Sequence, residues 1–237
     1  MDLTALEEEF HARVHSSIPG ATVLYAINGP DARNLERAAA PEGCRLMATR
    51  PRFNHGVLDG LHAALASGSR RIVRMDSAEH PAEVLPDVLT RLSDDSMRVI
   101  DLSFLQDVTL RSGSADSYHN LYVIPEVLAA LAGEGLRVSG THGFMVMPAP
   151  VLALVLPLVD AALALVEAEG RQVIWGADTM LAVCAAKVGF EVCIEKVPAE
   201  EMRDRDEAKC AAQLRDTLAL VKSVGRLHLE DLQLAGS

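Results

Sequence analysis

The chain has 237 residues, a formal net charge of −11 and a hydrophobic share of 49%. This length supports one large domain or two small ones with a sizeable core. The acidic balance argues against a general binder of nucleic-acid backbones, although backbone amides, a few arginines and a metal ion can still bind a nucleotide. The four cysteines have no CxxC spacing and are interpreted as reduced thiols.

Two features decide the expected location. The N-terminal segment, MDLTALEEEF, is acidic and lacks the apolar stretch of a signal peptide. The most apolar run, 151–166, is interrupted by Pro157 and Asp160 and is shorter than the roughly 20 residues of a spanning helix. A buried or amphipathic helix is expected there. We therefore expect a soluble, cytoplasmic protein with no membrane span and no nucleic-acid partner.

Helices and strands alternate through the first half of the chain. Apolar residues at helical spacing, with breaks at proline and glycine, predict helices over 3–18, 31–40, 57–66 and 81–92. Short apolar runs predict strands over 21–27, 44–49 and 70–75. Two segments with the composition of turns, 28–31 and 54–56, follow the first two strands.

The second half continues this alternation. Strands are predicted over 97–104 and 190–197, and 138–147 is interpreted as a strand-loop-strand element. Helices are predicted over 122–131, 151–166 and 179–188, followed by a charged helix from 200 to about 225. The polar segment 106–120 is predicted to be a loop. This order predicts an α/β fold, with a mostly parallel sheet flanked by helices, in a single domain over 1–237.

A carboxylate, Asp76, lies where the third predicted strand ends. Ile72, Val73 and Met75 are typical of a buried strand, and poor strand formers follow Asp76. Ligands of open α/β sheets bind outside the carboxyl ends of strands, so Asp76 is a site candidate. Taken alone, a solvated turn residue is the simpler interpretation.

The segment 50–86 resembles a known enzyme family. Its motifs, in order, are Arg50-Pro51, Asn54-His55-Gly56, the alanine-rich 63–68, Val73-Arg74-Met75-Asp76, His80-Pro81 and Glu83-Val84-Leu85-Pro86. In order and spacing they resemble inverting GT-A glycosyltransferases, the nucleotide-sugar family that includes dolichyl-phosphate mannose synthases. A second match, which resembles the acceptor-side element of that family, is Trp175-Gly176-Ala177-Asp178 followed by Gly189-Phe190-Glu191-Val192. The resemblance covers roughly 3–205, and it implies a GT-A-like, Rossmann-like fold.

The chain departs from the family pattern in three places. The first nucleotide-binding strand of the family is missing or rewritten, so that 21–31 matches the second strand and its turn. The D-x-D metal motif is degenerate and reads Asp76-Ser77-Ala78, without its second aspartate. No hydrophobic tail for a polyprenyl-phosphate acceptor is present in the sequence.

The resemblance implies a division of labour along the chain. Residues 1–100 would form the nucleotide-sugar half, 101–200 the acceptor half, and 201–237 a C-terminal helix and tail. The implied contacts with the nucleotide sugar come from Asn28, Asp31, Arg50, Asn54, Gly56 and Asp76. Trp175 and His80 are implied on the acceptor side. For Arg50, fixation of the loop is an equal alternative to a contact with phosphate. For Trp175, packing in the core is an equal alternative to a contact with the acceptor.

Sugar transfer needs help at both ends of the reacting bond. A divalent cation, Mg²⁺ or Mn²⁺, would offset the charge that grows on the departing diphosphate. Asp76 is implied as one ligand, Glu79 or His80 as a replacement for the missing one, and His142 as a further candidate. The acceptor hydroxyl needs a general base, and the resemblance assigns this role to Asp178. The alternative for Asp178 is a helix N-cap.

Two hypotheses follow. The first is a metal-assisted inverting glycosyltransferase of specialised metabolism that moves a sugar from a UDP- or GDP-sugar to a small soluble acceptor, with a homodimer as one assembly that the sequence allows. The alternative is a degenerate GT-A-like protein that binds a nucleotide or a protein partner without sugar transfer. A GT-A nucleotidyltransferase is disfavoured because no glycine-rich phosphate loop lies near the first strand.

Overall fold

The computed structural model describes residues 3–28, 43–75, 81–101, 143–197 and 207–227. Its helices are α1 (Leu3–Ser17), α2 (Phe53–Ala66), α3 (Leu85–Arg91), α6 (Ala149–Ala168), α7 (Ala177–Lys187) and α8 (Glu207–Val224), with a 3-10 turn, η2 (Ala82–Val84), before α3. Its strands are β1 (Val23–Ile27), β2 (Cys44–Ala48), β3 (Arg71–Arg74), β4 (Ser96–Asp101), β5 (Met145–Pro148) and β6 (Glu191–Lys196). The predicted helices 31–40 and 122–131 and the predicted loop 106–120 lie outside the described residues.

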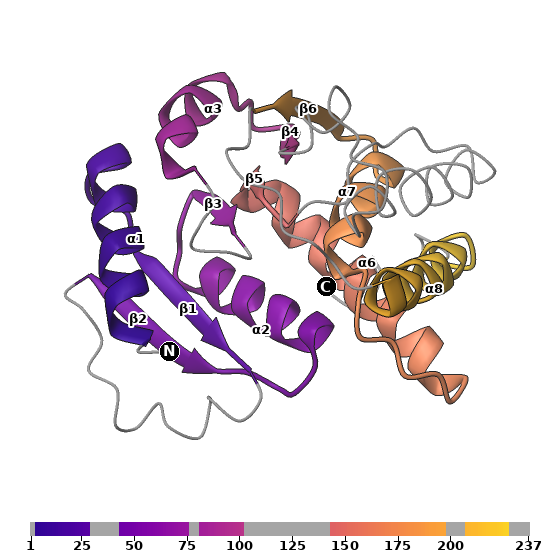
Figure 1. Cartoon of the computed structure of the whole chain (residues 1–237). Coiled ribbons are helices and arrows are strands. Elements are labelled where there is room, and N and C mark those ends of the chain that lie inside the picture. The colour runs from indigo at the N-terminus through magenta and orange to yellow at the C-terminus, as the bar shows by residue number, and fades with distance from the viewer. Residues whose placement is uncertain (1–2, 29–42, 76–80, 102–142, 198–206, 228–237) are drawn as a thin grey trace.

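The described strands form two sheets with helices against them, which confirms the α/β class (Figure 1). Strands β1 and β2 pair in parallel, and the second sheet has the order β3-β5-β4-β6. The predicted parallel direction holds for β4 with β6, whereas β5 is antiparallel to both β3 and β4. The sequence did not reveal this direction, because a short strand buried on both faces has the same apolar pattern whichever way it runs.

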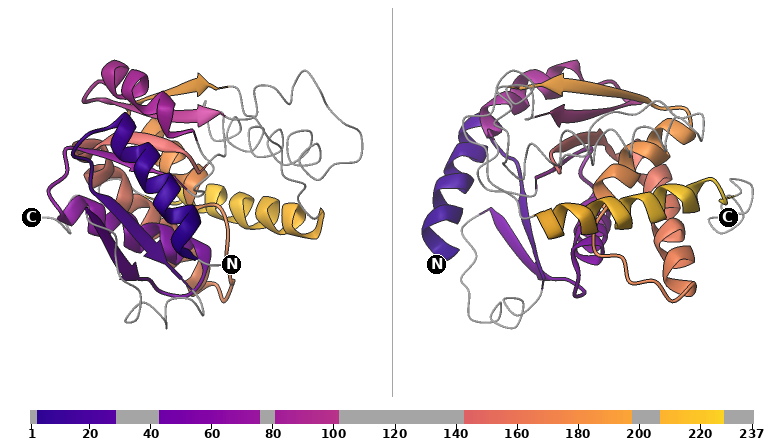
Figure 2. Two further views of the ribbon diagram at one scale, coloured as in Figure 1. Left: turned by 60° about the vertical axis from the view of Figure 1, so that its left-hand side comes forward. Right: turned by 45° about the vertical axis from the view of Figure 1, so that its right-hand side comes forward.

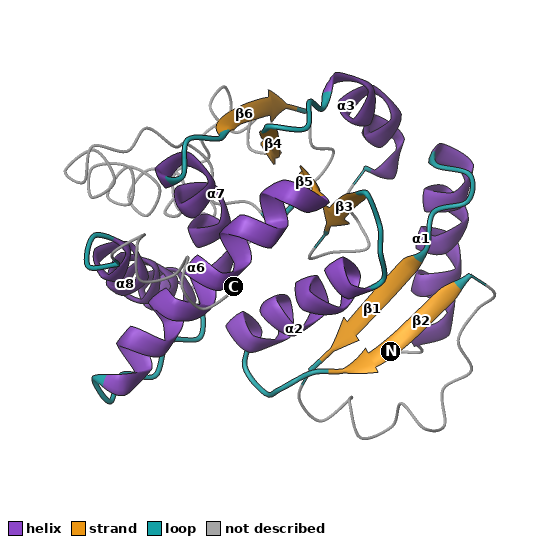
Figure 3. Ribbon diagram, turned by 180° about the vertical axis from the view of Figure 1, so that it is seen from behind, coloured by secondary structure: helices purple, strands orange, loops and turns teal. Residues whose placement is uncertain are grey.

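The β3-β5-β4-β6 sheet separates two hydrophobic clusters. Along β5, Met145 and Met147 belong to the cluster that includes residues of α2, α6, α7 and α8. Phe144 and Val146 belong to the cluster that includes residues of α1 and α3. This alternation is the two-residue period of a strand, and it places apolar side chains on both faces of the sheet. Figure 3 shows the sheet from behind, with α6 and α7 on one side and α1 and α3 on the other.

Helix α6 is the longest helix of the larger cluster. It starts after Pro148, as expected for a proline just before or within a first helical turn. With 20 residues and a mean hydropathy of 2.3 in its most apolar window, it is the one described helix that meets the length and composition of a membrane span. Half of that window is buried inside the molecule. The prediction of a buried or amphipathic helix is confirmed, whereas the predicted length was too short.

Helix α2 packs closely on the β1–β2 sheet, beside which it lies in Figure 3, and Figure 2 gives two further views of the whole chain. A Cβ atom added at Gly60 would lie 2.9 Å from Cβ of Ala26, and one added at Gly56 would lie 2.9 Å from Nδ2 of Asn28. The two glycines are one helical turn apart and face the same way. Only residues without a side chain allow the helix to approach the strands this closely.

The turn predicted over 54–56 is wrong, because these residues form the first turn of α2. The chain changes direction one residue before the helix, at Arg52, whose φ is 83°. A positive φ is uncommon for a residue other than glycine, and so no sequence signal indicated a turn there. Asn54 and Gly56, which suggested a turn, lie in the first turn of α2. There the Asn54 side chain forms hydrogen bonds, and Gly56 allows close packing against Asn28.

Candidate functional site

Asp178 and Arg74 form a buried ion pair. Arg74 is the last residue of β3, and Asp178 is the second residue of α7. Nη2 of Arg74 lies 2.8 Å from Oδ1 of Asp178, and the side chains are only 8% and 11% exposed. Nη1 of Arg74 also donates to the carbonyl oxygen of Gly143. Asp178 is not the N-cap residue of α7, a position that Gly176 occupies.

The backbone at Gly176 requires glycine for two reasons. Its φ is 112°, in the region that L-residues with side chains rarely adopt. A Cβ atom at this position would also lie 3.0 Å from Cα of Thr217 in α8. The glycine therefore lets α7 start close against α8, and this fixes where Asp178 lies.

Two aromatic rings lie beside the ion pair. The ring centroids of Phe53 and Trp175 are 4.9 Å apart. Cζ of Arg74 lies 5.6 Å from the centroid of Phe53, close enough for a cation–π interaction. Trp175 is half-buried, so that it combines packing against Phe53 with an accessible part. The packing agrees with the alternative of core packing, and the acceptor-side role of Trp175 stays a prediction.

Asn54 holds the segment that carries Trp175 and Asp178. Its side chain is fully buried, its Oδ1 accepts the backbone N–H of Ala177 at 3.0 Å, and its Nδ2 donates to the carbonyl oxygen of Trp175 at 3.1 Å. Its own backbone N–H donates to the carbonyl oxygen of Ile174 at 3.0 Å. The predicted contact between this side chain and a nucleotide does not fit such burial. Asn54 acts instead as a positioning residue for the segment before α7.

Asp216 of α8 holds the same segment from another direction. Its side chain is 2% exposed, and its Oδ2 accepts the backbone N–H groups of Ile174 at 2.8 Å and Trp175 at 3.4 Å. A buried carboxylate needs such donors, since burial without hydrogen bonds is costly. The segment therefore has hydrogen bonds to α2 on one side and to α8 on the other.

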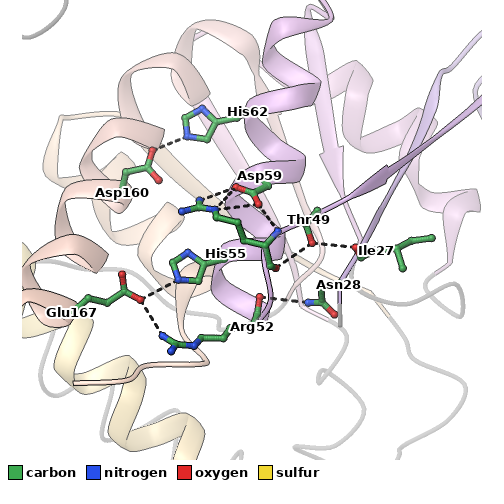
Figure 4. A network of polar contacts seen from close by, with 10 residues as sticks. Ile27, Asn28, Thr49, Arg52, His55, Asp59, His62, Asp160 and Glu167 are labelled. Carbon is green, nitrogen blue, oxygen red and sulfur yellow. Dashed lines mark hydrogen bonds and ion pairs between the residues drawn. The ribbon is translucent and has the colours of Figure 1, made fainter. Parts of the chain in front are cut away.

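An open polar cavity of about 540 Å³ lies at the start of α2. Its lining residues are Arg50, Pro51, Arg52, His55, Glu167, Gly170, Arg171 and Gln172. Figure 4 shows Glu167, at the end of α6, between Arg52 and His55. An oxygen of Glu167 lies 3.3 Å from Nη1 of Arg52 and 3.0 Å from Nε2 of His55. The lining is rich in cationic groups, with one carboxylate among them.

Arg50 is fixed by Asp59. Its guanidinium lies 2.7 Å from Oδ1 of Asp59, and its backbone N–H donates to Oδ2 at 2.8 Å. Burial works to raise the pKa of Asp59, but the hydrogen bonds and the charge of Arg50 outweigh it and lower this pKa. The hydrogen bond to Asp59 also raises the pKa of Arg50. The structure thus supports loop fixation by Arg50, which the sequence left equal to a phosphate contact.

Three predicted residues meet at the carboxyl ends of β1 and β2. Asn28 follows β1, and its Nδ2 lies 3.5 Å from the carbonyl oxygen of Arg52 (Figure 4). Gly56 packs against Asn28, and Arg50 follows β2. Trp175 and Asp178 lie on the other side of the first turn of α2, where Asn54 bonds to their segment. The N-terminus of α2 therefore links both groups of candidates.

The remaining candidates lie outside the described residues: Asp31, Asp76, Glu79, His80 and His142. The proposed metal ligands are all in this group. Within the described ranges, no cluster of three His, Cys, Asp or Glu side chains could hold a metal ion. The divalent cation therefore stays a prediction from the sequence.

Several residues of the site were not singled out from the sequence. Arg74 is part of a motif in the resemblance without a role of its own, although an arginine inside an apolar strand is itself a signal that it has a buried partner. Asp216 offered a weaker signal, as an acidic residue within a charged helix. Phe53 and Glu167 offered none, because their role depends on segments that are distant along the chain.

No protein-family model and no curated protein matches the chain. Three chains of known structure match. One of them is glucosyl-3-phosphoglycerate synthase from Mycobacterium tuberculosis, in complex with uridine diphosphate. The two chains are 15% identical, the match covers 86% of this chain and 68% of that one, and the TM-score is 0.45. The assignment of an activity therefore depends on the residues of this chain.

Proposed function

We propose that this chain is a nucleotide-sugar glycosyltransferase of GT-A-like fold that transfers a sugar to a small acceptor. The observation that carries the proposal is the bond between the two motif segments. Asn54 lies in the donor-side motif and Trp175 in the acceptor-side motif, 121 positions away, and the Asn54 amide donates directly to the Trp175 carbonyl oxygen. Donor and acceptor sites of a transferase have to meet in this way, because the reacting groups must be in contact.

Asp178 is the proposed general base. The guanidinium of Arg74 offsets the charge of this buried carboxylate, and a general base accepts the acceptor proton on such a carboxylate oxygen. In an inverting transfer, the acceptor oxygen attacks the anomeric carbon as its proton moves to the carboxylate, and the bond to the diphosphate breaks on the opposite side. Arg74 is then a positioning residue, since it holds the carboxylate and does not touch the substrate.

The cationic cavity supports the donor side of the proposal. Arg52, His55 and Arg171 line it, and guanidinium groups match phosphate oxygens in geometry and charge. We place the diphosphate near this lining, at the carboxyl ends of β1 and β2. Asp76, with Glu79, His80 or His142, is proposed to hold Mg²⁺ or Mn²⁺, which would offset the charge of the leaving group.

One observation favours the alternative, a protein that binds a nucleotide without transferring sugar. The side chain of Asp178 is only 11% exposed and is already paired with Arg74. An acceptor hydroxyl has to reach within hydrogen-bond distance of a general base. If the ion pair persists when ligand binds, the carboxylate is inaccessible and transfer is absent.

Calorimetry and a turnover assay separate the two functions. We expect UDP- or GDP-sugars to bind, with tighter binding when Mn²⁺ is added, and to be turned over by transfer or by donor hydrolysis. Asp178→Asn should lower turnover by about 10²- to 10⁴-fold and leave donor binding within about twofold. Asp160→Asn, which changes a carboxylate of α6 that pairs with His62, is the matched control and should change neither quantity.

Two results would decide against the proposal. Metal-linked nucleotide binding without any turnover supports the binding protein. Turnover that is unaffected by Asp178→Asn excludes the assigned base.

A further inference from the structure

A thiol and an imidazole are in contact at the opposite end of the β1–β2 sheet from the cavity. Sγ of Cys44, the first residue of β2, lies 2.9 Å from Nδ1 of His11 in α1. Figure 1 shows α1 lying across this pair of strands. His15, one helical turn after His11, packs edge-on against it, with ring centroids 4.2 Å apart. Neither imidazole takes part in the proposed transfer reaction.

The neighbouring glycine makes room for this arrangement. Gly43 has a φ of 80°, and a Cβ atom there would lie 3.3 Å from Nε2 of His15. A larger residue would press on His15 and, through it, on His11. The position of the imidazole over Cys44 therefore depends on the glycine as well as on α1.

The contact has a chemical consequence for Cys44. In the tautomer that carries its hydrogen on Nε2, the Nδ1 atom of His11 accepts the thiol proton. Transfer of that proton gives a thiolate beside an imidazolium, and the thiolate is the nucleophilic form of cysteine. A histidine at hydrogen-bond distance is thus the means by which a thiol becomes reactive near neutral pH.

The other described cysteines lack such activation. Cys184 is fully buried in α7, and burial raises its pKa to about 12. Cys193 in β6 is half-buried, and its pKa is raised by burial and by Glu191 and Glu195, although Arg98 opposes this. Neither thiol has a histidine contact among the hydrogen bonds of the described residues, so both serve as internal controls.

We propose that Cys44 is a modification site that reacts with low-molecular-weight disulfides, with His11 as the proton acceptor. The thiol proton moves to Nδ1 of His11, and the Cys44 sulfur attacks one sulfur of R–S–S–R. A bond forms between Cys44 and that sulfur while the original S–S bond breaks. The departing thiolate takes the proton back from His11, so the products are a mixed disulfide and one thiol. This inference does not depend on the proposed transferase activity.

Trypsin places each cysteine of the chain on a peptide of its own, which makes the test direct. The peptides are 38–45, 172–187, 188–196 and 210–215. The native protein is treated with glutathione disulfide at about pH 6.5, where an ordinary thiol of pKa about 8.5 is almost entirely protonated. Mass spectrometry then follows the mixed disulfide on each peptide. We expect Cys44 to react faster than Cys193 by on the order of tenfold.

Substitution of the imidazole tests its role. His11→Ala should slow the reaction of Cys44 by on the order of tenfold and leave Cys193 unchanged. His62→Ala, which removes an exposed histidine paired with Asp160, is the matched control and should leave both rates unchanged. If His11→Ala does not fold, His11→Gln, whose amide cannot take up the thiol proton, replaces it and should slow the reaction of Cys44 to a similar extent. Equal rates at Cys44 and Cys193 in the native protein, or a Cys44 rate unaffected by His11→Ala, would overturn the proposal.

Discussion

At the scale of single residues, Arg74 and Asp178 form a buried ion pair within the candidate site. Both side chains are nearly buried, and each supplies the charge that makes burial of the other tolerable. Removal of one partner leaves an uncompensated charge, which is usually more costly than the loss of the whole pair. The pair is therefore testable by stability as well as by turnover.

Arg74→Ala should lower the free energy of unfolding by about 3–5 kcal/mol. Arg71→Ala, at an exposed position of the same strand, is the matched control and should cost about 1 kcal/mol or less. The double variant Arg74→Ala with Asp178→Ala should lose less than the sum of the single variants, because the pair is coupled. Urea denaturation measures the loss for each variant, including Asp178→Ala alone, and additive losses would show that the pair contributes no coupling.

Asp59 predicts a dependence of stability on pH. Its pKa in the folded chain is lowered, so its contribution is present above the unfolded pKa of about 4 and is lost as the pH falls through the folded value. Asp59→Asn should cost about 1 kcal/mol or less at pH 7, since the Arg50 side chain is 56% exposed and solvent screens the pair. Denaturation at a series of pH values should show this difference disappearing in acid. Asp94→Asn, at an exposed position, is the control for the substitution itself and should cost about 0.5 kcal/mol or less at pH 7.

At the scale of elements, segment 172–176 is positioned by its neighbours and has no regular structure of its own. Asn54 of α2 and Asp216 of α8 together bond to the backbone of Ile174, Trp175 and Ala177. A segment without a backbone ladder depends on such side chains for a fixed conformation. The placement of Asp178 is therefore a property of three helices, α2, α7 and α8.

Replacement of a glycine of α2 by alanine should destabilise the protein, although the same replacement usually stabilises a helix. Gly60→Ala would ordinarily stabilise a helix by about 1 kcal/mol. Here the new Cβ would lie 2.9 Å from Cβ of Ala26, so the variant should instead lose about 1–3 kcal/mol. Combining it with Ala26→Gly removes the opposing atom and should restore part of the loss in thermal or urea unfolding. A stabilised Gly60→Ala protein would show that α2 does not pack against β1 in this way.

At the scale of the whole molecule, α6 belongs to the hydrophobic core, although its length and hydropathy also fit a membrane span. Two adjacent residues distinguish its faces. Leu154 is 60% exposed and Val155 is 1% exposed. Burying a charge without a partner is among the most costly substitutions, whereas an exposed position tolerates one.

Val155→Arg should lower the free energy of unfolding by more than about 4 kcal/mol or prevent folding, and Leu154→Arg should change it by about 0.5 kcal/mol or less. Circular dichroism during urea unfolding, without detergent, measures both. Equal losses from the two substitutions would contradict the described burial of one face of α6.

Within the described residues, the sequence by itself determined most of the helices and strands, because hydrophobic periodicity is local. Its predicted bounds match those of β1, β2, β3 and β6 within a few residues, it indicated a buried or amphipathic helix at α6, and it identified the two motifs that Asn54 connects. It misplaced the start of α2, since a positive φ at Arg52 has no residue signature.

Only the tertiary structure decided the direction of β5, the partner of Asp178 and the role of Asn54. Each depends on which distant segments come into contact, and a strand or a carboxylate has the same local sequence whatever its partner. Arg74 lies more than 100 positions from Asp178 along the chain, so nothing near either residue specifies the ion pair. The sequence determines the chemistry of each side chain. The packing of α2, α7, α8 and β3 determines which of these side chains come into contact.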